Sequence, residues 1–198
     1  MKTRIAVFVS GGGTNLQALI DAADAGHLPS GEIVLVVASS PKAYALERAA
    51  KAGIPTAVVR SKEPDHEKTI HETLKAHRID MIVLAGYMSI LSESFTARFP
   101  NRILNVHPSL IPSFCGKGYY GLRVHEEALK RGVKVTGATV HFVNEIPDGG
   151  EILLQKAVDV LPDDTPETLQ RRVMEQAEWK LLPQATETVA HKIMEERE

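Results

Sequence analysis

The feature that most constrains this sequence is a repeated alternation between short strand-like runs and segments of helical periodicity. Residues 5–9 form a continuous apolar run that ends at Ser10 and three glycines, which is typical of a strand buried on both faces. Further short strands are expected at residues 33–38, 56–59, 81–85 and 103–106. Strands that alternate with helices indicate βαβ units and a parallel sheet with right-handed connections.

Capping and turn residues mark the helices between these strands. Thr14 with Gln17 three residues later is a capping-box pattern, so the first helix is expected to begin at Thr14. Thr165 followed by Pro166 predicts the start of a long C-terminal helical segment, with a kink at Pro183. The other helices are expected over residues 43–52, 67–77, 92–99 and 124–131.

The pattern changes after residue 107. Residues 133–143 and 151–160 are long β-rich runs on either side of an Asp148-Gly149-Gly150 turn, which favours an antiparallel pair. We therefore expect one α/β domain over residues 1–198, with a doubly wound, mostly parallel sheet and helices on both faces. Residues 1–107 form its doubly wound half, and residues 108–198 form a mixed half that completes the site.

The composition limits the classes of function. A chain of 198 residues with 43% hydrophobic residues can bury a core without a metal or disulfide staple. The net charge of -2 gives no sign of a nucleic-acid or anionic-membrane partner, and no apolar run approaches the roughly 18 residues of a membrane span. The N-terminal apolar run is too short for a signal peptide, and the single Cys115 excludes an intramolecular disulfide. We expect a cytoplasmic protein that acts on small molecules, as a monomer or a homodimer.

The glycine-rich segment from Ser10 to Asn15 lies between a buried strand and the start of a helix, where backbone N–H groups and the helix dipole favour an anion. Both the dinucleotide pattern and the P-loop pattern fail here, because Leu16 and not a small residue stands three places after Gly13 and no Gly-Lys-Ser/Thr follows. We interpret the segment as a site for one phosphate monoester, which makes residues 1–107 the phosphate-binding half. The alternative is a tight turn without a ligand.

A second glycine-rich segment, residues 116–121, does match the dinucleotide pattern G-x-G-x-x-G. It follows no strand, and no acidic residue marks a second strand after it. We interpret it as a flexible loop with aromatic tips. Cys115 beside it is interpreted as structural, since no base is paired with it.

Polar residues at the end of the fifth expected strand form the second candidate site. Asn105 and His107 project from the same face of that strand, and ligands bind at the carboxyl ends of strands in doubly wound sheets. An amide beside an imidazole can polarise a carbonyl and move a proton. Asp148 could reach that histidine and raise its pKa, although Asp-Gly is also a strong turn signal. Other interpretations stay open at this point. Asn105 could cap the end of the strand, and His107 could be a buried histidine whose hydrogen bonds are all made. His141 could be a core residue or a site residue.

The remaining histidines do not indicate a metal site. His66, His71 and His77 lie on or beside one helix, none is four residues from another, and no cysteine or carboxylate cluster accompanies them. We therefore expect no metal.

Taken together, these segments resemble the phosphoribosylglycinamide formyltransferases, the folate-dependent enzymes of purine synthesis. The likeness spans essentially the whole chain, and the stretch Asn-x-His-Pro-Ser-Leu with a later Asp-Gly-Gly is specific to folate formyltransferases and their relatives. The segments that carry the resemblance are residues 10–17, 84–91, 104–112, and 137–143 with 148–150.

The resemblance implies the formyltransferase fold and a reaction in purine (IMP) synthesis. The primary amine of N1-(5-phospho-D-ribosyl)glycinamide would attack the formyl carbon of 10-formyltetrahydrofolate, the co-substrate. Asn105 would donate a hydrogen bond to the oxyanion, and His107 would transfer a proton or stabilise the oxyanion as imidazolium. Asp148 would keep His107 protonated and help pass protons to the leaving N10.

The resemblance also implies binding residues for each substrate. The ribonucleotide would be held by Gly13, Thr14 and Asn15 at its phosphate and by Glu178. The folate pocket would be formed by Met88, Ser89, Ile90, Leu91, Asn105 and His141.

Three departures from the family pattern stand out. Many members carry arginine where this chain has Ser89, and the loop over residues 113–121 is longer than in many members. A basic residue near positions 60–68 touches folate in the family, and Lys62, His66 and Lys68 are the candidates here. Two alternative functions are a formyltetrahydrofolate deformylase-type hydrolase, which lacks the glycine-rich loop, and a non-catalytic sensor of phosphate ligands.

Overall fold

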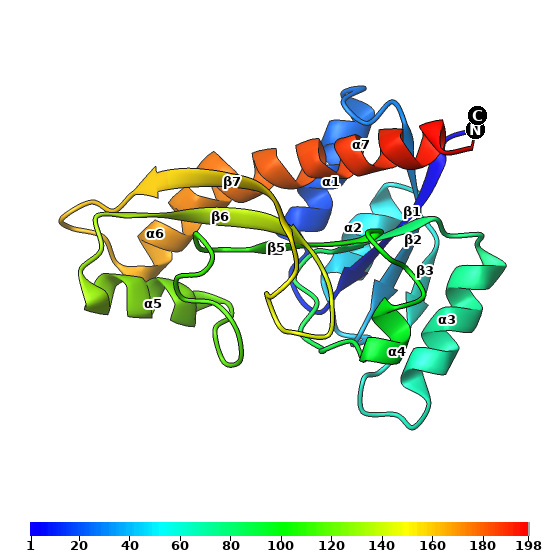
Figure 1. Ribbon diagram of the computed structural model, residues 1–198, viewed down its shortest axis with the longest axis horizontal. Helices are drawn as coiled ribbons and strands as arrows, with labels where there is room; N and C mark the ends of the chain where they lie inside the picture. The colour runs from blue at the N-terminus through cyan, green and yellow to red at the C-terminus, as the bar shows by residue number, and fades with distance from the viewer. Residues whose placement is uncertain (198) are drawn as a thin grey trace.

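A computed structural model describes residues 1–197 and contains one seven-stranded sheet with the order β3-β2-β1-β4-β5-β6-β7 (Figure 1). The first five strands are parallel, whereas β6 is antiparallel to β5 and β7 is antiparallel to β6. The mostly parallel α/β sheet with a mixed C-terminal half is thereby confirmed. The strands are β1 (Thr3–Val9), β2 (Gly31–Ala38), β3 (Thr56–Val58), β4 (Met81–Leu84), β5 (Ile103–His107), β6 (Val135–Phe142) and β7 (Ile152–Asp159).

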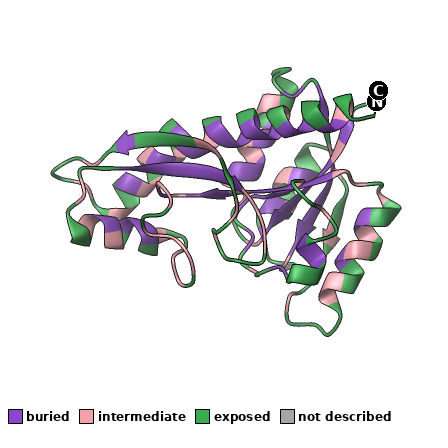
Figure 2. Cartoon of the chain, viewed as in Figure 1, coloured by how far each residue is buried: buried purple, intermediate pink, exposed green. Residues whose placement is uncertain are grey.

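Helices cover both faces of the sheet. Successive side chains of its central strands point to opposite faces, and both sets are therefore buried (Figure 2). On β1, Ile5 and Val7 belong to the core under α1, α2, α6 and α7, while Ala6 and Phe8 belong to the core under α3 and α4. The helices are α1 (Thr14–Asp24), α2 (Ala45–Lys51), α3 (His66–Ala76), α4 (Glu93–Thr96), α5 (Leu122–Arg131), α6 (Pro166–Val173) and α7 (Trp179–Glu195).

The helix starts follow the expected residues with one correction. Thr165 caps α6 with a complete capping box, and Ser92 caps α4 through the N–H of Phe95. The capping box expected at Thr14 is wrong. The N-cap of α1 is Gly13, in a left-handed conformation with φ 72°, so Thr14 is already helical and the N–H of Gln17 bonds to the Gly13 carbonyl.

Most elements differ from their expected ranges by one or two residues at an end, and two differ more in length or regularity. The helix α4 covers four residues rather than 92–99, because the turns before Pro100 tighten into i→i+3 hydrogen bonds. The C-terminal helical segment is continuous, but a π-helical turn, η1 (Met174–Glu178), separates α6 from α7. Pro183 lies five residues after this turn, buried inside α7.

The strand order determines where a ligand site can form. The connection after β1 leads to a helix on one face of the sheet, and the connection after β4 leads to a helix on the other face. Neighbouring strands whose connections diverge leave a crevice at their carboxyl ends, where doubly wound proteins bind ligands. The segments from Ser10 and from Gly86 onward therefore flank one crevice, and β5 ends beside it.

Among residues 1–197, no helix has the length and apolar character needed to cross a membrane.

The contact between β6 and β7 gives a stability prediction. A Cβ atom on Gly137 would lie 2.0 Å from the carbonyl oxygen of Lys156 on the neighbouring strand. Because this is backbone, we expect Gly137→Ala to lower the free energy of unfolding by about 3 kcal/mol in chemical denaturation. Gly53→Ala is the control, since a Cβ there meets open space and only its φ of 68° is unfavourable, at about 1 kcal/mol. Equal losses in the two variants would contradict the prediction.

Candidate active site

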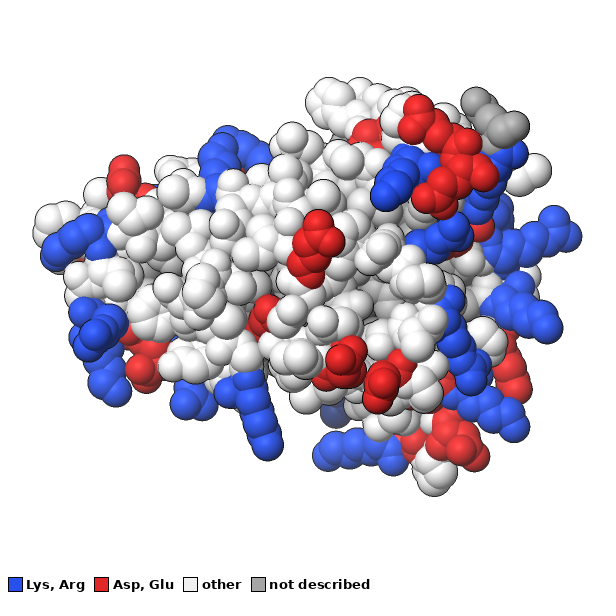
Figure 3. All heavy atoms as spheres, in the orientation of Figure 1, with Lys and Arg blue, Asp and Glu red and all other residues white. Residues whose placement is uncertain are grey.

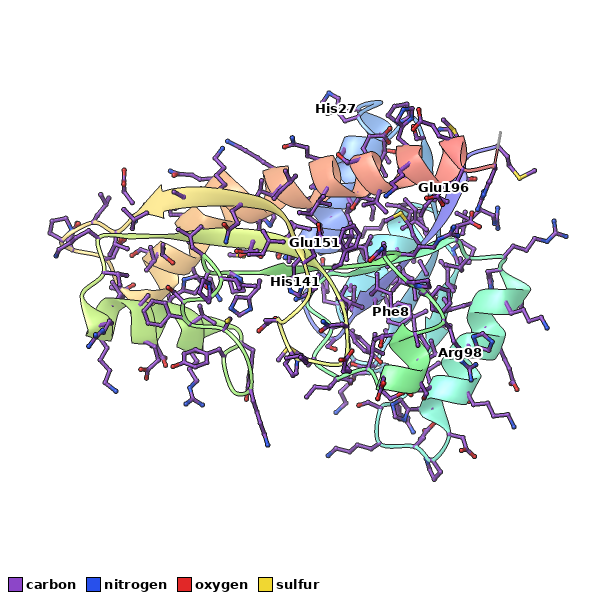
Figure 4. All side chains as sticks on the ribbon, in the orientation of Figure 1. Phe8, His27, Arg98, His141, Glu151 and Glu196 are labelled. Atoms are coloured by element: carbon purple, nitrogen blue, oxygen red, sulfur yellow. The ribbon has the colours of Figure 1, made fainter. Side chains whose placement is uncertain are left out.

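The site begins where the ends of β5 and β6 pair. Asn105 lies directly opposite His141 in the antiparallel register, and its Nδ2 is 3.2 Å from Nε2 of His141 (Figure 4 labels His141). The other ring nitrogen of His141, Nδ1, donates to the carbonyl of Phe142 at 2.8 Å. An amide nitrogen has two hydrogens, so Asn105 keeps one donor for a further partner.

Asp148 completes this cluster from the loop between β6 and β7. Its Oδ2 is 3.5 Å from Nδ1 of His107, and its Oδ1 is 3.6 Å from Nε2 of His141. The same Oδ2 accepts the N–H of Gly116 at 2.8 Å. Asp148 has a left-handed backbone with φ 55° and stands in a turn closed by the N–H of Gly149 and the carbonyl of Ile146. Asp148 therefore stands in a turn and also places its carboxylate near the two histidines, so the two interpretations of this residue do not exclude each other.

The electrostatics of the pair differ from the expectation that Asp148 keeps His107 protonated. His107 is 4% exposed, and burial lowers its pKa below the ordinary value, although Asp148 and the Phe114 carbonyl act in the opposite direction. Burial also acts to raise the pKa of Asp148, but His141, the charge of His107 and the Gly116 N–H outweigh it, so that pKa is lowered. Asp148 is the ionised member of the pair, and a neutral His107 can accept a proton.

The loop over residues 113–121 covers the other edge of His107. The Nε2–H of His107 donates to the carbonyl of Phe114 at 2.8 Å, so only Nδ1 faces the carboxylate. Cys115 donates its thiol to the carbonyl of Pro112, and burial followed by the charge of Asp148 raises its pKa. A raised thiol pKa opposes a role as nucleophile.

The glycine-rich segment and the C-terminal helical segment meet on the opposite side of the crevice. The Nδ2–H of Asn15 donates to Oε2 of Glu178 at 2.8 Å, and Oγ1 of Thr14 lies 3.9 Å from the sulfur of Met174. Gly13 has no room for a side chain, since a Cβ would lie 2.6 Å from that of Ala45. Glu178 is buried, and this burial raises its pKa to about 7 despite the hydrogen bond from Asn15.

One cavity of about 580 Å³ brings most of the expected residues together. The expected residues on its lining are Asn15, Met88, Ser89, Ile90, Leu91, Asn105, His107, His141, Asp148 and Glu178. Thr14 lines a neighbouring cavity of about 390 Å³ instead, and Gly13 is on neither lining. His66 and Lys68 line a separate recess beside Phe95, and Lys62 is absent from the lining of the 580 Å³ cavity.

The cavity also contains residues that the sequence patterns did not single out. His125 on α5 is 0% exposed, and both of its ring nitrogens lack a hydrogen-bond partner among residues 1–197. Gln170 and Met174 line the cavity at four-residue intervals before Glu178, a helical spacing that could have identified them once Glu178 was chosen. Tyr87, one residue before the expected Met88, also lines the cavity, and its ring packs on Phe8.

In the part of the chain that the structure describes, no three His, Cys, Asp or Glu side chains are grouped so that they could hold a metal ion.

Comparison with known proteins gives consistent matches over this fold and site. The formyl transferase family matches residues 3–186. A phosphoribosylglycinamide formyltransferase of Haemophilus influenzae is 44% identical over 184 residues, which are 91% of this chain and 84% of that protein. The crystal structure of phosphoribosylglycinamide formyltransferase from Brucella melitensis is 43% identical with a TM-score of 0.86, and the match covers 96% of each chain.

Some similar proteins are much longer than this chain. A trifunctional purine biosynthetic protein adenosine-3 of Bos taurus is 45% identical over 195 residues, and the match covers 96% of this chain but only 18% of that protein. A formyltetrahydrofolate deformylase structure from Burkholderia mallei is more distant, at 27% identity and a TM-score of 0.84, and the match covers 97% of this chain and 66% of that one.

The buried carboxyl of Glu178 gives a pH-dependence prediction. Its pKa of about 7 in the folded chain exceeds the ordinary 4.5, so the folded state binds the proton more tightly than the unfolded state. The resulting stability is present below pH 4.5 and is lost as the pH rises towards 7. We expect the free energy of unfolding, relative to Glu178→Gln, to fall by roughly 3 kcal/mol between pH 4.5 and 8.

Chemical denaturation across this range measures the difference. Glu175→Gln, which changes an exposed carboxyl of the same π turn, is the matched control. A difference between wild type and Glu178→Gln that stays constant with pH would contradict the prediction.

Proposed function

This chain belongs to the formyl transferase family, and on that premise we propose that it transfers the formyl group of 10-formyltetrahydrofolate to the amine of N1-(5-phospho-D-ribosyl)glycinamide. The products are the N-formyl ribonucleotide and tetrahydrofolate, a step in the synthesis of IMP. The observation that carries the proposal is the single cavity that contains Asn105, His107, His141 and Asp148 on one side and the Asn15–Glu178 pair on the other. The whole chain, residues 1–198, would act as one formyltransferase domain.

The ribonucleotide would bind between α1 and the π turn. The first N–H groups of α1 and the side chains of Thr14 and Asn15 offer donors to a phosphate, and Gly13 lets the phosphate approach the backbone. Glu178 would accept hydrogen bonds from the hydroxyl groups of the ribose. The 3.9 Å contact of Thr14 with Met174, which lines the cavity, supports a position for the phosphate next to this cavity.

The formyl donor would occupy the part of the cavity formed by the segment after β4. Met88 and Ile90 are 53% and 66% exposed although both are large apolar side chains, whereas Leu91 is buried. Exposed apolar groups at a cavity are suited to a flat aromatic ring such as the pterin. The main-chain groups of Ser89, Ile90 and Leu91 would bind its polar edge, with Asn105 and His141 next to the formyl group.

The transfer forms one bond from carbon to nitrogen and breaks another. The amine nitrogen attacks the formyl carbon, and the carbonyl oxygen becomes an oxyanion that the free N–H of Asn105 stabilises. Nδ1 of the neutral His107 takes up the proton that the amine loses, and the ionised Asp148 beside it stabilises the imidazolium that forms. When the C–N10 bond breaks, N10 receives this proton, so no net proton is left on the enzyme.

The proposal includes the compartment and the partners. A single cysteine fits a reducing compartment, and we propose that the protein is cytoplasmic and acts on small molecules rather than on nucleic acid or membranes. The related deformylase is the second candidate function, because its chemistry needs only water in place of the amine.

Tetrahydrofolate release measured by absorbance separates these functions. We expect release from 10-formyltetrahydrofolate only when the ribonucleotide is present. Release at the same rate without the ribonucleotide would support the hydrolase, and no release in either case would support a non-catalytic sensor.

Asp148→Asn tests the catalytic assignment. The amide is similar in size to the carboxylate but carries no charge to stabilise a protonated His107, so we expect turnover to fall at least tenfold while the melting temperature changes little. Asp24→Asn, exposed at the end of α1, should retain full turnover. An unchanged rate in Asp148→Asn would remove Asp148 from the mechanism.

A further inference from the structure

The cavity is poor in positive charge for a site that receives anionic substrates. Among residues 1–197, Lys117 is the only lysine or arginine on its lining, which also carries the carboxyl groups of Asp148 and Glu178. Most lysine and arginine side chains lie towards the ends of the molecule on the face that Figure 3 shows, and its middle is mostly uncharged apart from several Asp and Glu side chains. The other cations considered for this role, Lys62 and Lys68, do not line the cavity.

From this charge distribution we propose that Lys117 binds an anionic group of an incoming substrate, either the phosphate of the ribonucleotide or a carboxylate of the folate tail. This inference rests on the proposed function, which supplies two anionic substrates. A lysine ammonium is a compact charge that pairs with phosphate or carboxylate oxygens without a fixed orientation. No carboxylate lies within ion-pair distance of Lys117 in the described part of the chain, so its charge is available.

The loop places Lys117 at a defined position beside the reacting groups. It stands between Gly116 and Gly118, whose φ angles are 86° and 91°, in a turn closed by the N–H of Tyr119 and the carbonyl of Gly116 at 3.1 Å. The N–H of Gly116 is bonded to Asp148. Lys117 therefore directly follows Gly116, the residue whose backbone contacts the cluster of Asp148 and His107.

Aromatic packing supports the other side of this turn. The ring of Tyr119 lies 6.4 Å from that of Phe114, and the guanidinium of Arg123 lies 5.9 Å above the Tyr119 ring. Arg123 is engaged there, and Arg48 is bonded to the Gly12 carbonyl and to Gln17 and lines the neighbouring cavity. Neither arginine replaces Lys117 on the lining of the 580 Å³ cavity.

The test compares Lys117→Met, Lys117→Arg and wild type in steady-state kinetics. We expect Lys117→Met to raise one KM about fivefold, the size of one exposed ion pair, with kcat within twofold of wild type. Lys117→Arg should restore that KM to within about twofold, and added salt should raise the KM of wild type more than that of Lys117→Met. Lys134→Met, an exposed lysine outside the cavity, is the matched control and should match wild type.

The two anions are distinguished by which KM changes. A higher KM for the ribonucleotide identifies the phosphate, whereas a higher KM for 10-formyltetrahydrofolate that is larger for the pentaglutamate than for the monoglutamate identifies the tail carboxylates. Unchanged KM values, a fall in kcat alone, or a Lys117→Arg variant as impaired as Lys117→Met would each overturn the inference.

A calorimetric readout separates this inference from the proposed function. The ribonucleotide alone and tetrahydrofolate pentaglutamate alone are titrated into wild type and Lys117→Met. A wild type that binds but releases no tetrahydrofolate in the assay contradicts the proposed function, whereas a weaker affinity in Lys117→Met still supports the anion site. Equal affinities in the two proteins overturn it.

Discussion

The arrangement of the site depends on the register between β5 and β6. This register places Asn105 opposite His141 and His107 opposite Thr139. Because side chains alternate across a strand, a slip by one residue would move His141 to the other face of the sheet. Thr139 reinforces the register, since its hydroxyl donates to the Ser109 carbonyl and accepts the N–H of Ile111. The antiparallel strand β6 thus positions His141, which is the partner of the Asn105 amide, and also the backbone segment that follows His107.

Burial and charge act against each other at the two sides of the cavity. Around His107, burial outweighs the neighbouring carboxylate and favours a neutral imidazole. Around Glu178, burial outweighs the amide of Asn15 and moves the carboxyl towards a neutral acid. Asp148 is different because three partners stabilise its charge. One carboxylate whose charge is stabilised therefore lies in the same cavity as two groups whose neutral form burial favours, which is an arrangement suited to moving a proton within the site.

The sequence predicts the sheet better than it predicts the details of the site. The strands and most helices follow from hydrophobic periodicity, because the alternation of buried faces is a local property. The position of Glu178 on the lining of the cavity depends on the π turn at residues 174–178. The sequence has no local pattern that predicts this turn. The net pKa of His107 depends on how deeply the folded chain buries it, and the carbonyl of Phe114 reaches Nε2 only after the loop has folded. The capping box predicted at Thr14 is absent because Gly13, which has a left-handed conformation, is the N-cap instead.

The buried Glu178 has a consequence for any molecule that binds beside it. Near neutral pH this carboxyl is divided between its acid and its ionised form. A ligand that hydrogen-bonds only to the ionised form must expel the remaining proton into the solvent, and the buffer then takes it up. The heat of binding therefore includes the ionisation enthalpy of the buffer. Affinities and enthalpies for this cavity become comparable between laboratories only when buffers with different protonation heats have been used and the released proton has been counted.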